Sequence, residues 1–126
     1  MGPYLVIIFQ LVGTILIEGC VMIVWQGSKE ALGYSVLCNL MTNPPLNLIL
    51  LYLSGQGIGL YATLTIRLLL EAAVVIIEAL AYMGMMKTDF KKSAAISLVL
   101  NLSSFGFGEI FGALGMWKVL AIMAAL

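Results

Sequence analysis

Carboxyl and amide side chains inside apolar segments are the residues of this sequence that could do chemistry. The stretch "RLLLEAAVVIIEALAY" carries Arg67, Glu71 and Glu78 among aliphatic residues. A carboxyl group removed from water favours its neutral form unless a cation or hydrogen-bond donors stabilise the charge. Ionisable side chains at such positions mark ion pathways and proton relays in membrane proteins. The stretch therefore suggests a site for a proton, a cation or a small polar solute.

The three charged residues of this stretch have different explanations. Arg67 and Glu71 are four residues apart, so they can form an ion pair on one helix face. Alternatively, Arg67 pairs with Glu109 and leaves Glu71 free. Glu78 has no basic residue within one turn, which makes it the best candidate for a carboxyl group that accepts a proton. Glu18 either joins this site or reaches the headgroups of the membrane.

Polar side chains recur at helical spacing in the other three apolar segments as well. A carboxylate that faces lipid is costly, so these stripes must face the centre of a helix bundle or a partner protein. At a rise of about 1.5 Å per residue, several of them reach the depth of Glu78 or Glu71. The candidate binding residues are Glu78, Glu71, Glu18, Asn43, Asn47, Asn39, Asn101, Arg67 and Tyr82.

The segment "TNPPLN" interrupts the second apolar segment. Pro44 and Pro45 lack N–H groups and clash with the preceding turn, which predicts a broken or kinked helix. Freed carbonyl groups with the Asn43 and Asn47 side chains could bind a cation, as broken spans do in many transporters. Alternatively, the half-helix that begins at Pro44 offers the positive end of its dipole to an anion. A third possibility is a packed kink whose amides bond to neighbouring helices.

The elements that position these residues are membrane-spanning helices. Hydrophobic residues make up 63% of the 126-residue chain and charged residues 10%, against about 45–50% and about 25% in soluble domains. Runs of about 20 apolar residues can span a bilayer. Four runs fit, at 4–25, 31–53, 60–86 and 93–115. We expect a single all-α transmembrane domain over 1–126, an antiparallel up-and-down four-helix bundle in which 116–126 form a possible short extension.

The lysine distribution predicts the orientation of the chain. Lys29 lies in the first connection, and Lys87, Lys91 and Lys92 lie in the third, whereas only Lys118 lies near the opposite end. Cytoplasmic loops carry the excess of Lys and Arg. We therefore expect the first and third connections in the cytoplasm and both termini outside, in a prokaryotic inner membrane.

Several classes of function have no support in the sequence. The chain has no histidine, the commonest general base and metal ligand, and no basic patch for nucleic acid. We expect no cofactor or metal, and an enzyme is the less favoured reading. Gly108 and Gly112 form a GxxxG pair for helix packing, within the bundle or in a homodimer. No strong internal repeat is visible.

Three functions are consistent with these patterns. The favoured one is a small transporter or channel, acting as a homo-oligomer, whose intramembrane carboxyl and amide groups bind a proton, cation or small polar solute. The second is a non-catalytic subunit whose polar faces pair with another membrane protein in a larger complex. The third is a lipid-binding protein or intramembrane enzyme that uses its glutamates.

Overall fold

The structure is a computed structural model that describes residues 2–123, and all regular secondary structure in that part of the chain is helical. The segments with periodic polar and apolar residues thus form helices, and the predicted all-α class is confirmed. The five helices are α1 (Pro3–Gln26), α2 (Lys29–Ser54), α3 (Leu60–Met86), α4 (Phe90–Ala113) and α5 (Met116–Met123).

Three of these helices are long and apolar enough to cross a membrane, namely α1 over Tyr4–Gln26, α2 and α4. Their bounds lie within three residues of those expected from hydropathy. The bounds of α3 coincide with the predicted 60–86. Its 27 residues would be about 40 Å long at 1.5 Å per residue. Arg67, Glu71 and Glu78 interrupt its apolar sequence.

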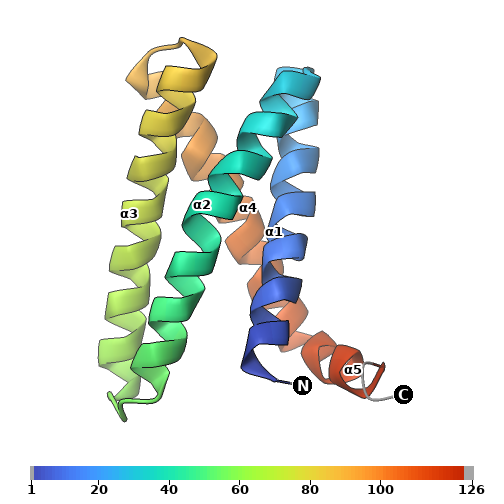
Figure 1. Cartoon of the computed structure of the whole chain (residues 1–126), viewed down its shortest axis with the longest axis vertical. Helices are drawn as coiled ribbons and strands as arrows, with labels where there is room; N and C mark the ends of the chain where they lie inside the picture. The colour runs from blue at the N-terminus through green and yellow to red at the C-terminus, as the bar shows by residue number, and fades with distance from the viewer. Residues whose placement is uncertain (1, 124–126) are drawn as a thin grey trace.

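The four long helices surround a common centre. In Figure 1, α1 and α3 run in one direction and α2 and α4 run in the other. Contacts join α1 to both α2 and α4, and join α3 to the same two helices. Between the described parts of α1 and α3, which lie diagonally, no such contact occurs, and the same holds for α2 and α4.

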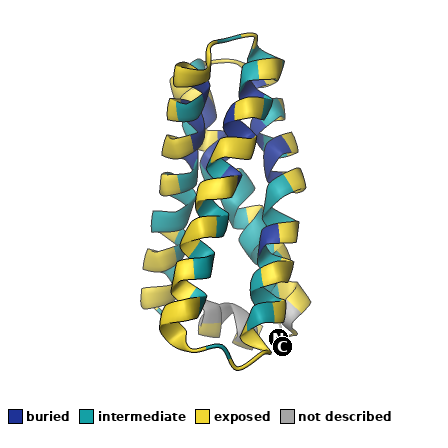
Figure 2. Ribbon diagram, turned by 90° about the vertical axis from the view of Figure 1, so that its left-hand side faces the viewer, coloured by how far each residue is buried: buried dark blue, intermediate teal, exposed yellow. Residues whose placement is uncertain are grey.

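The two ends of this arrangement differ in packing. Buried residues gather toward the end that holds the α1–α2 and α3–α4 connections (Figure 2); we call it the closed end. The opposite end, with the α2–α3 connection and the N-terminus, is the open end. The apolar core of the closed end consists of Met22, Ala31, Cys38, Tyr82, Ile96 and Leu100.

Local signals define the corners of the closed end. Ser28 caps α2 by accepting a hydrogen bond from the Ala31 N–H at 3.0 Å. Asp89 caps α4 in the same way through the Lys92 N–H at 2.7 Å. Left-handed residues end both preceding helices, Gly27 at φ 66° after α1 and Lys87 at φ 51° after α3. Glycine adopts this conformation without steric cost, whereas lysine does not.

Replacing Lys87 by glycine should therefore stabilise the protein. Relief of the left-handed strain outweighs the greater chain entropy that glycine has when unfolded, by about 0.5–1 kcal/mol. The free energy of unfolding in detergent would measure this gain. The matched variant Lys91→Gly, inside the first turn of α4, should instead lose stability; a loss in both variants would contradict the assignment of strain to Lys87.

The structure describes two features that the sequence left open, the proline segment of α2 and the residues after α4. The helix α2 continues through Pro44 and Pro45 as one element, rather than as two half-helices; a kink there stays a prediction. Residues after Ala113 do not lengthen α4 as a continuous helix. Gly115 adopts a left-handed conformation at φ 68°, and the chain turns into the separate α5, whereas 124–126 lie outside the described residues.

Candidate functional site

Glu18 of α1 is held by donors from two other helices. The residue is 1% exposed, and its Oε2 accepts a hydrogen bond from Asn39 Nδ2 of α2 at 2.7 Å. Its Oε1 accepts one from Ser104 Oγ of α4, also at 2.7 Å. The sequence-based alternative in which Glu18 reaches the headgroups is wrong, because its carboxyl group faces the centre of the helices.

Glu78 of α3 is held by donors from the same two helices. It is also 1% exposed, and its Oε1 accepts a hydrogen bond from Thr42 Oγ1 of α2 at 2.7 Å. Its Oε2 accepts from Asn101 Nδ2 of α4 at 2.6 Å and from Ser97 Oγ at 3.4 Å. Both carboxyl groups therefore connect α2 to α4, whose backbones do not approach each other closely in the described part of the chain.

Neither buried carboxyl group has a cationic partner within the described residues. The ion pairs there are those of Arg67, with Glu109 at 3.1 Å and with Glu71 at 3.9 Å. The Arg67 guanidinium also lies 4.9 Å from the centre of the Phe105 ring. A buried charge without an opposite charge is costly. Neutral donors alone surround Glu18 and Glu78, so a bound proton or cation would lower this cost.

Hydroxyl groups give the network two ways to satisfy its hydrogen bonds. Thr42 Oγ1 lies 2.9 Å from the Cys38 carbonyl oxygen as well as 2.7 Å from Glu78. A hydroxyl has one hydrogen and can also accept. When Glu78 is ionised, Thr42 donates to it. When Glu78 is protonated, it can donate to Thr42 while Thr42 donates to the carbonyl group.

The same two arrangements are available at the other hydroxyl groups of the network. Ser104 Oγ lies 3.2 Å from the Asn101 carbonyl oxygen, in addition to its bond with Glu18. Ser97 Oγ lies 2.9 Å from the Val75 carbonyl oxygen. Gain or loss of a proton on either carboxyl group thus leaves no hydroxyl unsatisfied.

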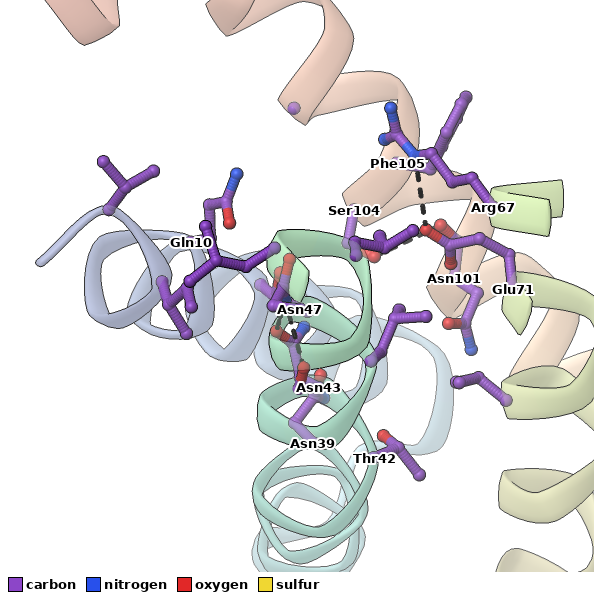
Figure 3. A pocket seen from close by; sticks show the side chains of 18 of the residues that line it. Gln10, Asn39, Thr42, Asn43, Asn47, Arg67, Glu71, Asn101, Ser104 and Phe105 are labelled. Atoms are coloured by element: carbon purple, nitrogen blue, oxygen red, sulfur yellow. Dashed lines mark hydrogen bonds and ion pairs between the residues drawn. The ribbon is translucent and has the colours of Figure 1, made fainter. Parts of the chain in front are cut away.

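A polar cavity of about 480 Å³ adjoins this network toward the open end. Figure 3 shows side chains from all four long helices around it, including Gln10 of α1 and Asn43 of α2. Glu78 lines the cavity, whereas Glu18 lies behind Asn39 and Ser104, outside its lining. Its polar lining residues are Gln10, Thr14, Asn39, Thr42, Asn43, Asn47, Thr63, Arg67, Glu71, Glu78, Asn101 and Ser104.

Charge and exposure both change along this cavity. The Arg67 and Glu109 side chains are 37% and 56% exposed, and the Glu71 side chain is 26% exposed. The floor, at Glu78, is 1% exposed. The ion pairs of Arg67 thus lie at the more exposed end of the cavity, and the buried carboxyl group of Glu78 lies at the other.

A groove of about 520 Å³ between α1 and α4 adjoins the polar cavity. Aromatic residues Phe9, Phe107 and Phe111 line it, and it shares Gln10 and Ser104 with the cavity. Gly108 and Gly112 also line the groove. A methyl group added at Gly108 would meet no atom within 4 Å. Gly108 is therefore not at a close helix contact within the chain, and its packing against a second copy stays a prediction.

No protein-family model, no curated protein and no solved structure matches this chain. The geometry of the site is therefore the basis for a functional assignment. Among the described residues, no group of three or more Cys, Asp or Glu side chains is placed to hold a metal ion.

The structure brings together part of the set chosen from the sequence. The carboxyl group of Glu18 accepts a hydrogen bond from the Asn39 amide, and that of Glu78 accepts one from the Asn101 amide. Both contacts lie at the depths estimated from helical rise. Asn47 Nδ2 instead donates to Asn43 Oδ1 on the same helix at 2.6 Å. These two amides and Glu71 line the cavity. The last member, Tyr82, packs in the core of the closed end, and its hydroxyl oxygen has no hydrogen-bond partner among the described residues.

Sequence reasoning missed Thr42 and gave Ser97 and Ser104 no role of their own. Thr42 follows Asn39 by three residues, as Ser104 follows Asn101. Residues three apart share one helix face. An amide followed at this spacing by a hydroxyl, on two helices, is the pattern that could have indicated these donors.

Proposed function

We propose that this protein is a small membrane transporter or channel that binds a proton or a cation at Glu78. The observation that carries the proposal is the position of this carboxyl group. It lies at the floor of a polar cavity and is fully buried, with neutral donors on both oxygens. A site that must repeatedly gain and lose positive charge needs a carboxyl group that no fixed cation neutralises.

The charges around the cavity favour a cation over an anion. Among the described residues, Arg67 is the one basic side chain in its lining, and that guanidinium is already paired with Glu109 and Glu71. Glu78 then adds a second acidic group to the lining. Asparagine and threonine oxygens supply further neutral ligands of the kind that suit hard cations.

In this proposal α3 crosses the membrane as a fourth span, and the four long helices form an up-and-down bundle. Burial of Glu78 and pairing of Arg67 inside the bundle lower the cost of placing α3 in lipid. With the first and third connections in the cytoplasm, the closed end faces inward and the cavity faces outward. Transport would require the closed end to loosen or a second copy to complete the route.

The alternative of a non-catalytic subunit receives less support. It needs polar faces that are available for another membrane protein. The carboxyl and amide groups of Glu18, Asn39, Glu78 and Asn101 are instead bonded to one another inside the chain. The exposed surface of the long helices is rich in large apolar residues, which suit lipid.

Reconstitution into liposomes tests the proposal. Vesicles with a pH-sensitive dye inside would report proton flux under a potassium diffusion potential, and isotopic Na⁺ and K⁺ would report cation flux. We expect the protein to carry protons or one of these cations. Glu78→Gln keeps the shape and hydrogen-bonding capacity of the side chain but cannot bind a proton, so it should reduce flux to the level of protein-free vesicles.

Glu30→Gln provides the control, because Glu30 lies exposed in the first turn of α2. That variant should carry ions at the rate of the unmodified protein. The proposed function would be contradicted if the vesicles with protein showed no more proton, Na⁺ or K⁺ flux than protein-free vesicles. It would also be contradicted if Glu78→Gln left the flux unchanged.

A further inference from the structure

The two helix pairs α1–α2 and α3–α4 correspond position by position. Residues of α1 match residues 60 further on in α3, as Glu18 matches Glu78. Residues of α2 match residues 62 further on in α4, as Asn39 matches Asn101. The connection after α3 is one residue longer than that after α1, and α4 begins one residue earlier than α2 in this correspondence. Identical pairs at these spacings are Ile17 and Ile77, Glu18 and Glu78, Lys29 and Lys91, Ser35 and Ser97, Asn39 and Asn101, and Leu40 and Leu102.

Burial follows the same correspondence. Six matched pairs are buried in both halves, although the residue types often differ. The buried positions recur at a spacing of 60 in α1 and α3 and at a spacing of 62 in α2 and α4. The pairs are Glu18 and Glu78, Gly19 and Ala79, Met22 and Tyr82, Ala31 and Ser93, Ser35 and Ser97, and Cys38 and Leu100.

The corners of the two helix pairs agree as well. The helices α1 and α3 end at Gln26 and Met86, 60 residues apart. Both are followed by a left-handed residue, Gly27 and Lys87. A side-chain cap then begins the next helix in each half. Each connection thus begins with a left-handed residue and ends with a capping side chain, and the second connection is one residue longer.

The hydrogen bonds of the two carboxyl groups obey the same relation. Glu18 takes an amide from Asn39 of its own half and a hydroxyl from Ser104 of the other half. Glu78 takes an amide from Asn101 of its own half and a hydroxyl from Thr42 of the other. Each amide also donates to the carbonyl group four residues earlier.

This exchange of hydroxyl groups is what a two-fold axis between the halves produces. Because α1 and α3 run in the same direction (Figure 1), that axis runs along the helices. Contacts between the halves are also reciprocal, since α1 packs on α4 and α3 packs on α2. Neither carboxyl site is complete within one half.

We propose that α1–α2 and α3–α4 are equivalent halves of a duplicated unit, and that Glu18 and Glu78 are two equivalent sites that each bind one proton. Each site combines a carboxyl and an amide group from one half with a hydroxyl group from the other. This proposal rests on the proposed function, because it specifies the ligand of the same site: two protons, one at each carboxyl group.

The surroundings of the two carboxyl groups agree in their neutral donors and differ in the titratable groups that face them, whose matched positions in the other half hold Leu100, Leu11 and Met22. The titratable groups that face them are Cys38 of α2, Glu71 and Tyr82 of α3, and each other. The helix α4 contributes neutral donors to both. A further departure occurs at the matched serines, because Ser97 Oγ approaches Glu78 whereas Ser35 Oγ has no hydrogen-bond partner in the described part of the chain.

The halves differ most at the open end. Arg67 and Glu71 of α3 match Ile7 and Leu11 of α1. Asn43 of α2 matches Phe105 of α4, and both line the polar cavity. The duplicated unit thus keeps its carboxyl site and differs where a solute would enter. Access from the cavity is direct for Glu78, and for Glu18 it passes through Asn39 and Ser104.

Infrared spectroscopy of the full chain in lipid nanodiscs tests this inference, because protonated and ionised carboxyl groups absorb at separate frequencies. Glu18→Gln and Glu78→Gln should each remove an equal share of the buried protonated-carboxyl signal, and the double variant should remove the sum. Glu30→Gln, at an exposed position, should remove none of it. Unequal losses, or no loss from either variant, would overturn the equivalence.

The exchanged donors give a second, sharper readout. In the Glu18→Gln variant, the remaining infrared signal is that of Glu78. Adding Thr42→Val or Asn101→Leu should shift its frequency, whereas adding Ser104→Ala should not. In the Glu78→Gln background, Ser104→Ala should shift the signal and Thr42→Val should not. If the signal of each carboxyl group shifted only when donors of its own half were replaced, the proposed donation of hydroxyl groups between the halves would be wrong.

Variants that fail to fold do not remove the test. The combined Thr42→Ser and Ser104→Thr variant keeps a hydroxyl group at both positions and exchanges their types. Equivalent sites should keep both signals in this variant, and loss of only one of them would contradict the inference. Because the measurement counts bound protons without transport, two equal signals in a protein that carries no ions would refute the proposed function and leave the equivalence intact.

Discussion

Asn39→Leu will destabilise the protein, and adding Glu18→Met to it will restore much of the loss. Leucine matches asparagine in shape but leaves Glu18 Oε2 without the donor now at 2.7 Å. An unsatisfied buried acceptor costs about 1–3 kcal/mol. Replacing both partners by apolar side chains removes the unsatisfied group instead. Ser104, which loses its acceptor in the double variant, can donate to the Asn101 carbonyl group at 3.2 Å.

The free energy of unfolding in mixed detergent micelles measures this cycle. Asn43→Leu is the matched control, because Asn43 lies one turn further along α2 and its amide oxygen bonds only to Asn47 of the same helix. The control should cost clearly less than Asn39→Leu. A double variant less stable than Asn39→Leu alone would show that the carboxyl–amide pair is itself stabilising, contrary to this account.

Leu100→Ala will lose far more stability than Leu102→Ala. Leu100 is 0% exposed in the core of the closed end, whereas Leu102, two residues along the same helix, is 60% exposed. In lipid, helices associate through close packing rather than through removal of apolar surface from water. A cavity at Leu100 forfeits that packing and should cost about 2–3 kcal/mol. At Leu102, lipid can fill the space, so the cost should stay below about 0.5 kcal/mol.

Thermal unfolding and detergent-induced unfolding of the two variants provide the measurement. Both substitutions replace leucine by alanine in α4, so helix propensity and the unfolded state change equally in each. The difference between the variants therefore reports packing alone. Equal losses would mean that the closed end is not the stabilising core of the protein.

The individual helices could be predicted from the sequence because their causes are local. Hydropathy and length located all four long helices, and the bounds of α3 at 60–86 were obtained from composition and flanking breaks. The spacing of polar residues placed Glu18, Asn39, Glu78 and Asn101 on helix faces that turn inward. Helical rise alone brought Glu18 to the depth of Asn39, where the structure has their hydrogen bond.

Other features depend on how the helices pack and could not be read from periodicity. Both Glu71 and Glu109 were possible partners of Arg67, and the structure has Arg67 within 4 Å of both, closer to Glu109. Two prolines predicted a broken or kinked second helix; α2 is one element, and a kink within it stays a prediction. The chain turns sharply at Gly115 because that residue adopts a left-handed conformation, which a glycine permits without requiring.

The correspondence of the two halves is a feature that the sequence alone does not reveal. Few residues are identical between the two halves. The number of residues between matched positions also changes from 60 to 62 at the α1–α2 and α3–α4 connections, so no strong repeat is visible in the amino-acid sequence. Local sequence determined that each helix has one polar face and one apolar face. Only the tertiary structure decided that the donors exchange between halves, because a hydrogen bond depends on distances between helices that no single helix encodes. The two carboxyl groups of Glu18 and Glu78 become comparable sites once both halves are in place.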